Sequence, residues 1–534
     1  MTGFVLRNGR IWTGDPSEPW AREAAIEGGR FVQVGNDLDA PLDGVIDLGD
    51  RLVVPGFWDA HAHLAYTGTA MAQVQLKGAT SIDEVQRRVA ERVASTPPGD
   101  WIEGAGWDQN DWPDARFPDR SALDAIAPHH PVVLVHTSGH CSWVNSAALT
   151  ASGIDRSTPA PGGGSLALDE AGEPTGMLFD RAMDLVSAAI PARRPRDRVD
   201  AIGRAMTHAH SLGIVGVHAM DVGWGELEAL QSLHSRGALH LRVRAFLSAR
   251  DEALWEGHAT NDGDEWLRIG GVKWFADGAL GSLTAWMEAP YEGSEDYGFP
   301  LQPVAELEAS VRRALSQGLA PAVHAIGDQA NREVLDLLER VAGIHAHLPR
   351  RIEHAQLLAL GLAQRFAALG ITASVQPIHA TQDMPKVDRH WGARGTHAYA
   401  FRSLLDAGVN LAFGSDTPVE TMDPLAGIHA AVTRQRADGT PAGGWQRAER
   451  VTVEDALRGY TTGPAHAVGE QDVAGRIATG YAADCAVLSH DIVRDPASLL
   501  EAQVEMTLAG GEVVYVRKGS RFEDYATSTA GART

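Results

Sequence analysis

The sequence of 534 residues contains only two cysteines, Cys141 and Cys485. They lie far apart and neither belongs to a Cys-x-x-Cys pair, so we expect neither a disulfide framework nor a thiolate zinc site. No apolar run approaches the roughly 18 residues of a membrane-spanning helix. The N-terminus also lacks an apolar segment of signal-peptide length. These absences predict a protein of the reducing cytoplasm that makes no membrane contact.

Positive charge is scarce. The chain has 46 lysines and arginines against 69 aspartates and glutamates, which gives a formal net charge of −23 at pH 7. A chain this acidic is not expected to bind nucleic acid or an anionic membrane. No block of like charge stands out, so the acidity indicates a solvated surface. Lysine is especially rare and occurs only at four positions: Lys77, Lys273, Lys386 and Lys518.

Both ends of the chain show short apolar runs separated by glycine turns. The first fifty residues contain FVLRNGRIWTG and AAIEGGRFVQVG, and the C-terminal part contains GRIATGYAADCAVLSHD and VEMTLAGGEVVYVRKG. Such runs with Asn-Gly and Gly-Gly turns are typical of β-strands. Because isolated strand pairs are marginally stable in water, we expect residues 1–52 and 465–534 to combine into one small β-sandwich.

Residues 53–464 alternate strand and helix signals. Helical patterns at Pro303–Leu319, Gln329–Ala342 and Leu360–Leu369 separate some of the apolar runs. Eight strands with crossovers predict a parallel (β/α)8 barrel of the TIM type, within the α/β class. An open doubly wound sheet is the alternative. The eight expected strands are Leu52–Phe57, Ile214–His218, Leu241–Leu247, Val272–Ala276, Pro321–Ala325, Arg351–Ala355, Thr372–Gln376 and Asn410–Gly414.

A long interruption follows the first expected barrel strand. About 150 residues pass before the second strand, and they contain their own strand, Pro131–His136. We interpret residues 68–195 approximately as an insertion. Loops that follow barrel strands carry function in this fold, so we expect the insertion to cover the active site.

A His-x-His pair gives the strongest local signal. In VVPGFWDAHAH, residues i and i+2 of an extended strand point the same way, so His61 and His63 can bind one ion. Neutral imidazoles suit zinc and related transition metals. The pair follows the first expected strand, at the barrel end where catalytic residues gather.

Further donors fall at or near the ends of other strands. Lys273 lies on the expected fourth strand, His324 on the fifth, His354 on the sixth, and Asp416 follows the eighth. Each has a simple structural alternative, such as an ion pair between Lys273 and Asp277. Their coincidence at one end of the barrel favours a shared site instead.

This pattern resembles the amidohydrolase superfamily, and in detail amidohydrolase family 3, the branch that contains N-substituted formamide deformylase. The matching stretches are GWDQNDW, GHCSWVNSAAL, KWFADGALGSLTA, HAIGDQANREVLD, RIEHAQ and FGSDTPVETMDPLAGI. The resemblance implies that His61, His63 and Asp416 bind one divalent metal, with zinc favoured. It implies that His324 and His354 bind a second ion, or orient substrate and water if only one binds. Lys273 would be carboxylated and bridge the two ions.

The resemblance implies hydrolysis of a non-peptide carbon–nitrogen bond in an amide, carbamate or cyclic amide of a small molecule. A metal-activated water would attack, and Asp416 would act as general base and then as general acid. His140 is a second catalytic candidate. Candidates for substrate contact are Trp107, Asp108, Tyr291 and His379, with weaker cases for His218 and His397.

Three alternatives stay open at this point. The tryptophans of the insertion could form its own small core instead of a substrate pocket. The same metal site could hydrolyse lactones or esters, or support decarboxylation or isomerisation, because fold and ligands are shared. A non-catalytic binding protein is a further alternative, which the presence of all six site residues disfavours. A homo-oligomer is a general expectation for barrels of this type.

Overall fold

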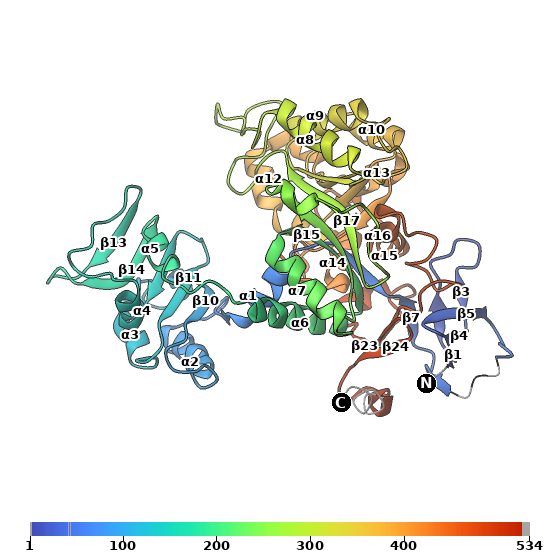
Figure 1. Ribbon diagram of the computed structural model, residues 1–534, viewed down its shortest axis with the longest axis horizontal. Coiled ribbons are helices and arrows are strands. Elements are labelled where there is room, and N and C mark those ends of the chain that lie inside the picture. Colours follow the sequence, from blue (N-terminus) through green and yellow to red (C-terminus); the bar gives the residue numbers. More distant parts are fainter. Residues whose placement is uncertain (1–2, 41, 43, 526–534) are drawn as a thin grey trace. The chain divides into compact units, whose positions relative to one another are not determined.

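The computed structural model describes residues 3–40, 42 and 44–525, and its largest sheet has eight strands (Figure 1). All neighbouring pairs in the sheet are parallel. The strands follow chain order: β8 (Phe57–Ala62), β15 (Ile214–Val222), β16 (Arg242–Ser248), β17 (Leu267–Phe275), β18 (Pro321–Ala325), β19 (Arg351–His354), β20 (Thr372–Val375) and β21 (Leu411–Phe413).

The sheet closes between its first strand and the segment that follows its last. Ala62 forms a parallel bridge with Thr417, the amide of Asp416 donates to the carbonyl of His61 at 2.8 Å, and the amide of His63 donates to the carbonyl of Thr417 at 3.0 Å. The predicted (β/α)8 barrel is therefore confirmed, and the open doubly wound sheet is excluded.

One expected strand was assigned to the wrong sheet. Residues 52–57 were expected to be the first barrel strand, but β7 (Leu52–Pro55) pairs with strands from both ends of the chain and lies in the sandwich. The barrel begins with β8, after Gly56. Both strands are buried along their whole length, and the sequence pattern alone cannot separate two buried strands joined without a polar turn.

The helices lie around the barrel strands (Figure 1). α8 (Val304–Ser316) buries Leu307, Val311, Ala314 and Leu315, the one-sided stripe expected of a helix that packs on a sheet. It lies where a helix was predicted, as do α9 (Asp328–Arg340) and α10 (Leu362–Leu369). Further α-helices between and after the barrel strands are α7 (Trp224–Ser235), α11 (Pro377–Gln382), α12 (Met384–His390), α13 (Phe401–Asp406), α14 (Pro424–Thr433), α15 (Val453–Gly459) and α16 (Thr462–Ala467).

Two further sheets form a sandwich from both ends of the chain, as predicted. One contains β5-β4-β1-β6 and the other β24-β23-β22-β7-β2-β3, and their shared core includes Phe31, Val53, Cys485 and Met506. The strands are β1 (Gly3–Arg7), β2 (Arg10–Trp12), β3 (Trp20–Ala21), β4 (Glu23–Glu27), β5 (Arg30–Gly35), β6 (Gly44–Asp47), β22 (Cys485–Leu488), β23 (Val504–Ala509) and β24 (Glu512–Val516).

The insertion is a compact unit of its own, residues 68–201. Its mixed sheet has the order β13-β14-β12-β11-β10-β9, and Trp107, Trp112 and Trp143 pack together in its core. Its elements are β9 (Val74–Gln75), α2 (Ile82–Val93), β10 (Ile102–Trp107), α3 (Arg120–Asp124), β11 (Val132–His136), β12 (Cys141–Val144), α4 (Ser146–Ala151), β13 (Gly164–Leu168), β14 (Pro174–Asp180) and α5 (Met183–Ser187). The helices α1 (Leu64–Ala72) and α6 (Pro195–Ser211) include the two unit boundaries.

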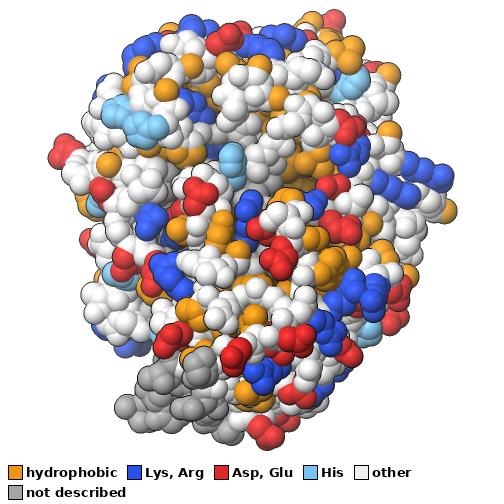
Figure 2. Space-filling model, turned by 90° about the vertical axis from the view of Figure 1, so that its right-hand side faces the viewer, with side chains coloured by type: hydrophobic (Ala, Val, Ile, Leu, Met, Phe, Trp, Pro, Cys, Tyr) orange, Lys and Arg blue, Asp and Glu red, His pale blue; other side chains and the backbone are white. Residues whose placement is uncertain are grey.

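The surface carries charge of both signs. Acidic and basic side chains are interspersed on the face drawn in Figure 2, in agreement with the expectation of an acidic but solvated surface. Within the part of the chain that the structure describes, no helix combines the length and the apolar character needed to span a membrane.

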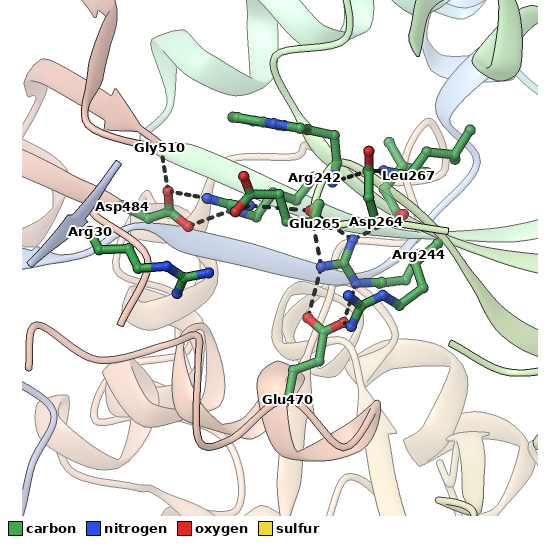
Figure 3. Close-up of polar contacts among 12 residues, drawn as sticks. Arg30, Arg242, Arg244, Asp264, Glu265, Leu267, Glu470, Asp484 and Gly510 are labelled. Carbon is green, nitrogen blue, oxygen red and sulfur yellow. Dashed lines mark hydrogen bonds and ion pairs between the residues drawn. The ribbon is translucent and has the colours of Figure 1, made fainter. Parts of the chain in front are cut away.

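Buried arginines join the barrel to the C-terminal segment (Figure 3). Arg242 on β16 binds both carboxylate oxygens of Asp484, at 2.7 and 3.1 Å. Arg244 binds both oxygens of Glu470 at 2.7 and 2.8 Å, and Arg268 adds a third contact to Glu470 at 2.7 Å. Charges buried this deeply are tolerated only while each keeps its partner.

Glu470→Gln should therefore lower the stability of the barrel markedly. The amide leaves the buried guanidinium of Arg244 without its counter-charge, and we expect the free energy of unfolding to fall by about 3 kcal/mol. Urea unfolding followed by circular dichroism measures the change. Glu339→Gln is the matched control, because Glu339 pairs with Arg365 at 2.7 Å but its side chain is 59% exposed. Equal, small effects of both substitutions would contradict a structural role for the Glu470 cluster.

Candidate metal centre

The carboxyl ends of the barrel strands bring two histidines and an aspartate together. His61 lies on β8, His63 follows it, and Asp416 follows β21. The Nε2 atoms of His61 and His63 lie 3.5 and 3.3 Å from Oδ1 of Asp416. These three side chains offer ligand atoms that all lie within 4.8 Å of one another, close enough to share one ion.

A second set of donors shares the same aspartate. His354 and His379 each offer a ring nitrogen within 4.8 Å of the other and of an Asp416 oxygen. The rings of His354 and His61 lie 4.8 Å apart between centroids, and those of His354 and His324 lie 4.6 Å apart. The structure thus brings His324 beside His354, but it groups the ligand atoms of His354 with His379.

Hydrogen bonds determine which ring nitrogen of His354 and of His324 is left to bind a metal ion. Nδ1 of His354 lies 2.8 Å from the amide oxygen of Gln376, and Nε2 of His324 lies 3.0 Å from the carbonyl of Gly278. Both partners only accept, so these nitrogens carry the proton. The other nitrogen of each ring, Nε2 of His354 and Nδ1 of His324, therefore keeps its lone pair for a ligand.

Burial keeps the imidazoles neutral. Desolvation lowers the pKa of His61 to about 4 and that of His354 well below its ordinary value. A metal ion must compete with protons for a histidine, and at neutral pH there is no proton to displace from these two.

Asp416 is ionised in this setting. Burial alone raises its pKa, but the neighbouring His61 and His63 lower it below its usual range. Its backbone is left-handed, with φ of 59°, as is that of His354, with φ of 71°. Non-glycine residues held in this region cluster at functional sites, where the surrounding structure imposes the strain.

Lys273 lies fully buried on β17. Among the described residues its Nζ has no hydrogen-bond partner, and burial lowers its pKa to about 8. The alternative ion pair with Asp277 is not formed. The Asp277 carboxylate instead accepts backbone hydrogen bonds from Ile326 and Gly327 at 3.0 and 2.9 Å.

His379 and His397, the two candidates after the seventh barrel strand, differ in burial. His379 is only 7% exposed, its Nε2 lies 4.0 Å from Asp416, and neither ring nitrogen has a hydrogen-bond partner among the described residues. Buried polar groups are normally paired, so this ring is directed to something the protein does not itself supply. His397 is exposed.

Other predicted residues already have partners within the protein. Tyr291 is buried and its hydroxyl donates to the carbonyl of Ala285 at 2.7 Å. His218 is buried and its Nδ1 accepts from Arg351 at 2.7 Å. Their contacts with substrate stay predictions.

Three predicted residues belong to the insertion unit. Trp107 is in its core and donates to the carbonyl of Leu134, as the alternative of a local tryptophan core expects. Asp108 accepts from the amide of Asn110 at 2.9 Å, and Nδ1 of the exposed His140 lies 2.9 Å from Asp180. Their roles toward substrate also stay predictions.

Sequence reasoning missed the charged residues inside the barrel. Arg351 and Glu353 are 1% and 0% exposed, and Asp59 is 1% exposed and accepts from the amides of His61 and Ser415. The sequence signal that could have found them is the pair Arg351 and Glu353, two opposite charges two residues apart in a strand that has to be buried on both faces.

A parallel barrel with histidines and an ionised aspartate gathered at its carboxyl end offers a site for a divalent metal ion. The comparisons agree: the sequence pattern of the amidohydrolase family matches residues 44–515. The chain belongs to the amidohydrolase family, and it is a metal-dependent hydrolase.

Relatives cover nearly the whole chain. Protein LONG AFTER FAR-RED 3 of Arabidopsis thaliana is 34% identical over 96% of this chain and 92% of its own length. N-substituted formamide deformylase of Arthrobacter pascens is 32% identical over 97% and 99%. The crystal structure of an uncharacterized metal-dependent hydrolase of Pyrococcus horikoshii superposes with a TM-score of 0.77 at 30% identity, covering 92% of this chain and 98% of that one.

His61→Ala should lose most of the bound divalent metal, because it removes one of the three donors that converge on a single point. Metal content per chain is measured by mass spectrometry after dialysis. His397→Ala, which removes an exposed histidine, should keep the wild-type content. Equal metal content in the two variants would place the ion elsewhere.

Proposed function

We propose that the protein hydrolyses a non-peptide carbon–nitrogen bond in a small amide, carbamate or cyclic amide. The observation that carries this proposal is the convergence of His61, His63 and His379 on the ionised carboxylate of Asp416. The relative that is named for deformylation of N-substituted formamides, alike over almost all of both chains, supports the choice of bond.

We propose that His61, His63 and Asp416 hold one divalent ion, with zinc favoured, and that His324 and His354 hold a second where two bind. Nitrogen and carboxylate donors are the ligands of zinc, and burial keeps His61 and His354 neutral and available. When bound, the metal supplies Lewis acidity, which lowers the pKa of a water from about 16 toward 7 and polarises the substrate carbonyl.

Lys273 is proposed to be carboxylated. Only the neutral amine reacts with carbon dioxide, and a pKa of about 8 leaves a substantial fraction of Lys273 neutral near pH 7 to 8. Carboxylation also converts a buried amine that has no hydrogen-bond partner among the described residues into an anion able to bridge two ions.

Asp416 is proposed to move the proton. Its ionised carboxylate takes the proton of the attacking water and delivers it to the nitrogen as the carbon–nitrogen bond breaks. An amine leaves only with that proton. His140 is proposed to stabilise the negative charge on the carbonyl oxygen, and Trp107, Asp108, Tyr291 and His379 to contact the substrate.

The two buried cysteines are free thiols, which supports the proposal of a reducing compartment, the cytoplasm.

A hydrolysis panel of N-acyl and N-formyl amines, cyclic amides and lactones tests the proposed reaction, with Asp416→Asn beside the wild type. We expect release of amine by the wild type, and a fall in kcat of about 100- to 10,000-fold in the variant, which has lost its proton carrier. Chromatography identifies the products. Turnover of lactones alone, or a decarboxylated or isomerised product, would overturn the choice of carbon–nitrogen bond.

Lys273→Ala should abolish turnover, and added short-chain carboxylic acids should restore part of it, because the free acid can occupy the space of a carboxylated side chain. Lys273→Arg should be inactive and should not respond to the acids, since a guanidinium stays charged and cannot be carboxylated. Steady-state rates with and without acid measure this. Full activity of Lys273→Arg would rule out carboxylation.

A further inference from the structure

A buried carboxylate lies directly behind one of the proposed metal ligands. Glu353 on β19 is 0% exposed, and its Oε2 lies 2.7 Å from Nδ1 of His61. The two residues come from different barrel strands, so this contact crosses the barrel interior.

The chemistry of this contact fixes the proton of His61. An ionised carboxylate only accepts hydrogen bonds, so Nδ1 of His61 must donate. The lone pair of the ring is then on Nε2, the nitrogen that lies 3.5 Å from Asp416. A hydrogen bond of this kind also limits rotation of the ring and makes Nε2 a stronger ligand.

Glu353 is itself held by Arg351. The guanidinium binds both carboxylate oxygens and, from the same side chain, donates to the carbonyl of Ala60 at 2.6 Å and to the hydroxyl of Ser374 at 2.7 Å. The two-point contact with a guanidinium that is itself anchored to the barrel holds the Glu353 carboxylate in place.

We propose that Glu353, anchored by Arg351, is a positioning residue that orients His61 and sets its tautomer for binding of the metal ion. The inference rests on the proposed metal site, which it deepens. It assigns the buried pair on β19 to the function of the site as well as to the stability of the barrel.

The test compares Glu353→Gln with the wild type in the metal-free full-length protein. The amide keeps the shape but loses the charge, and it can donate as well as accept, so the tautomer of His61 is no longer fixed. We expect the Kd for Zn²⁺, measured by competition with a chromophoric chelator, to rise about 10- to 100-fold. The visible absorption of the Co²⁺ form should change as well, because it reports ligand geometry.

Glu470→Gln is the matched control. It also removes a buried carboxylate bound by an arginine of a barrel strand (Figure 3), but Glu470 makes no contact with the metal ligands among the hydrogen bonds and ion pairs of the described residues. It should lower the unfolding midpoint and leave the Kd for Zn²⁺ unchanged. An equal loss of affinity in both variants would mean that general destabilisation is the cause, and the proposal would be wrong.

Glu353→Asp covers the case in which Glu353→Gln does not fold. It keeps the charge opposite Arg351 but is shorter by one methylene, so it should weaken metal binding less than the amide does. Wild-type affinity in whichever of these variants folds would overturn the positioning role alone. A wild-type protein that binds no divalent ion would instead overturn the proposed metal site, and with it this inference.

Discussion

Closure of the parallel sheet is the constraint on which the site depends. The two hydrogen bonds that join β8 to the segment after β21 connect the backbones of His61 and Asp416, and of His63 and Thr417. They place an aspartate from the end of the barrel sequence against two histidines from its beginning. Without these two hydrogen bonds the aspartate would have no fixed position relative to the two histidines, because no helix or strand contains all three residues.

Burial of charge has two different consequences in this barrel. At one end, Arg242 and Arg244 bind Asp484 and Glu470 and join the barrel to the segment that leads into the sandwich. Below the site, Arg351 binds Glu353, whose second contact is a proposed metal ligand. Such pairs stabilise little by themselves, since desolvation offsets the attraction, but neither partner can be removed alone. Each buried charge in the barrel interior is therefore tolerated only together with its partner.

Much of the fold could be predicted from the sequence, because strand and helix periods follow from which faces are buried. The strand-end positions of His61, Lys273, His354 and Asp416 came from that pattern together with a family resemblance. The boundary at Gly56 could not be predicted, since both neighbouring strands are buried. The contrast between His379 and His397 depends on how the helical segment after β20 folds, and the contact between Glu353 and His61 depends on barrel register. Neither leaves a periodic signal in the chain.

Anomalous X-ray diffraction at the zinc absorption edge, on crystals of the protein with zinc added, is the most direct measurement of the central claim. We predict an anomalous peak about 2 Å from Nε2 of His61, Nε2 of His63 and a carboxylate oxygen of Asp416. A peak bound by other residues, with these three side chains turned away from it, would contradict the assignment of the site.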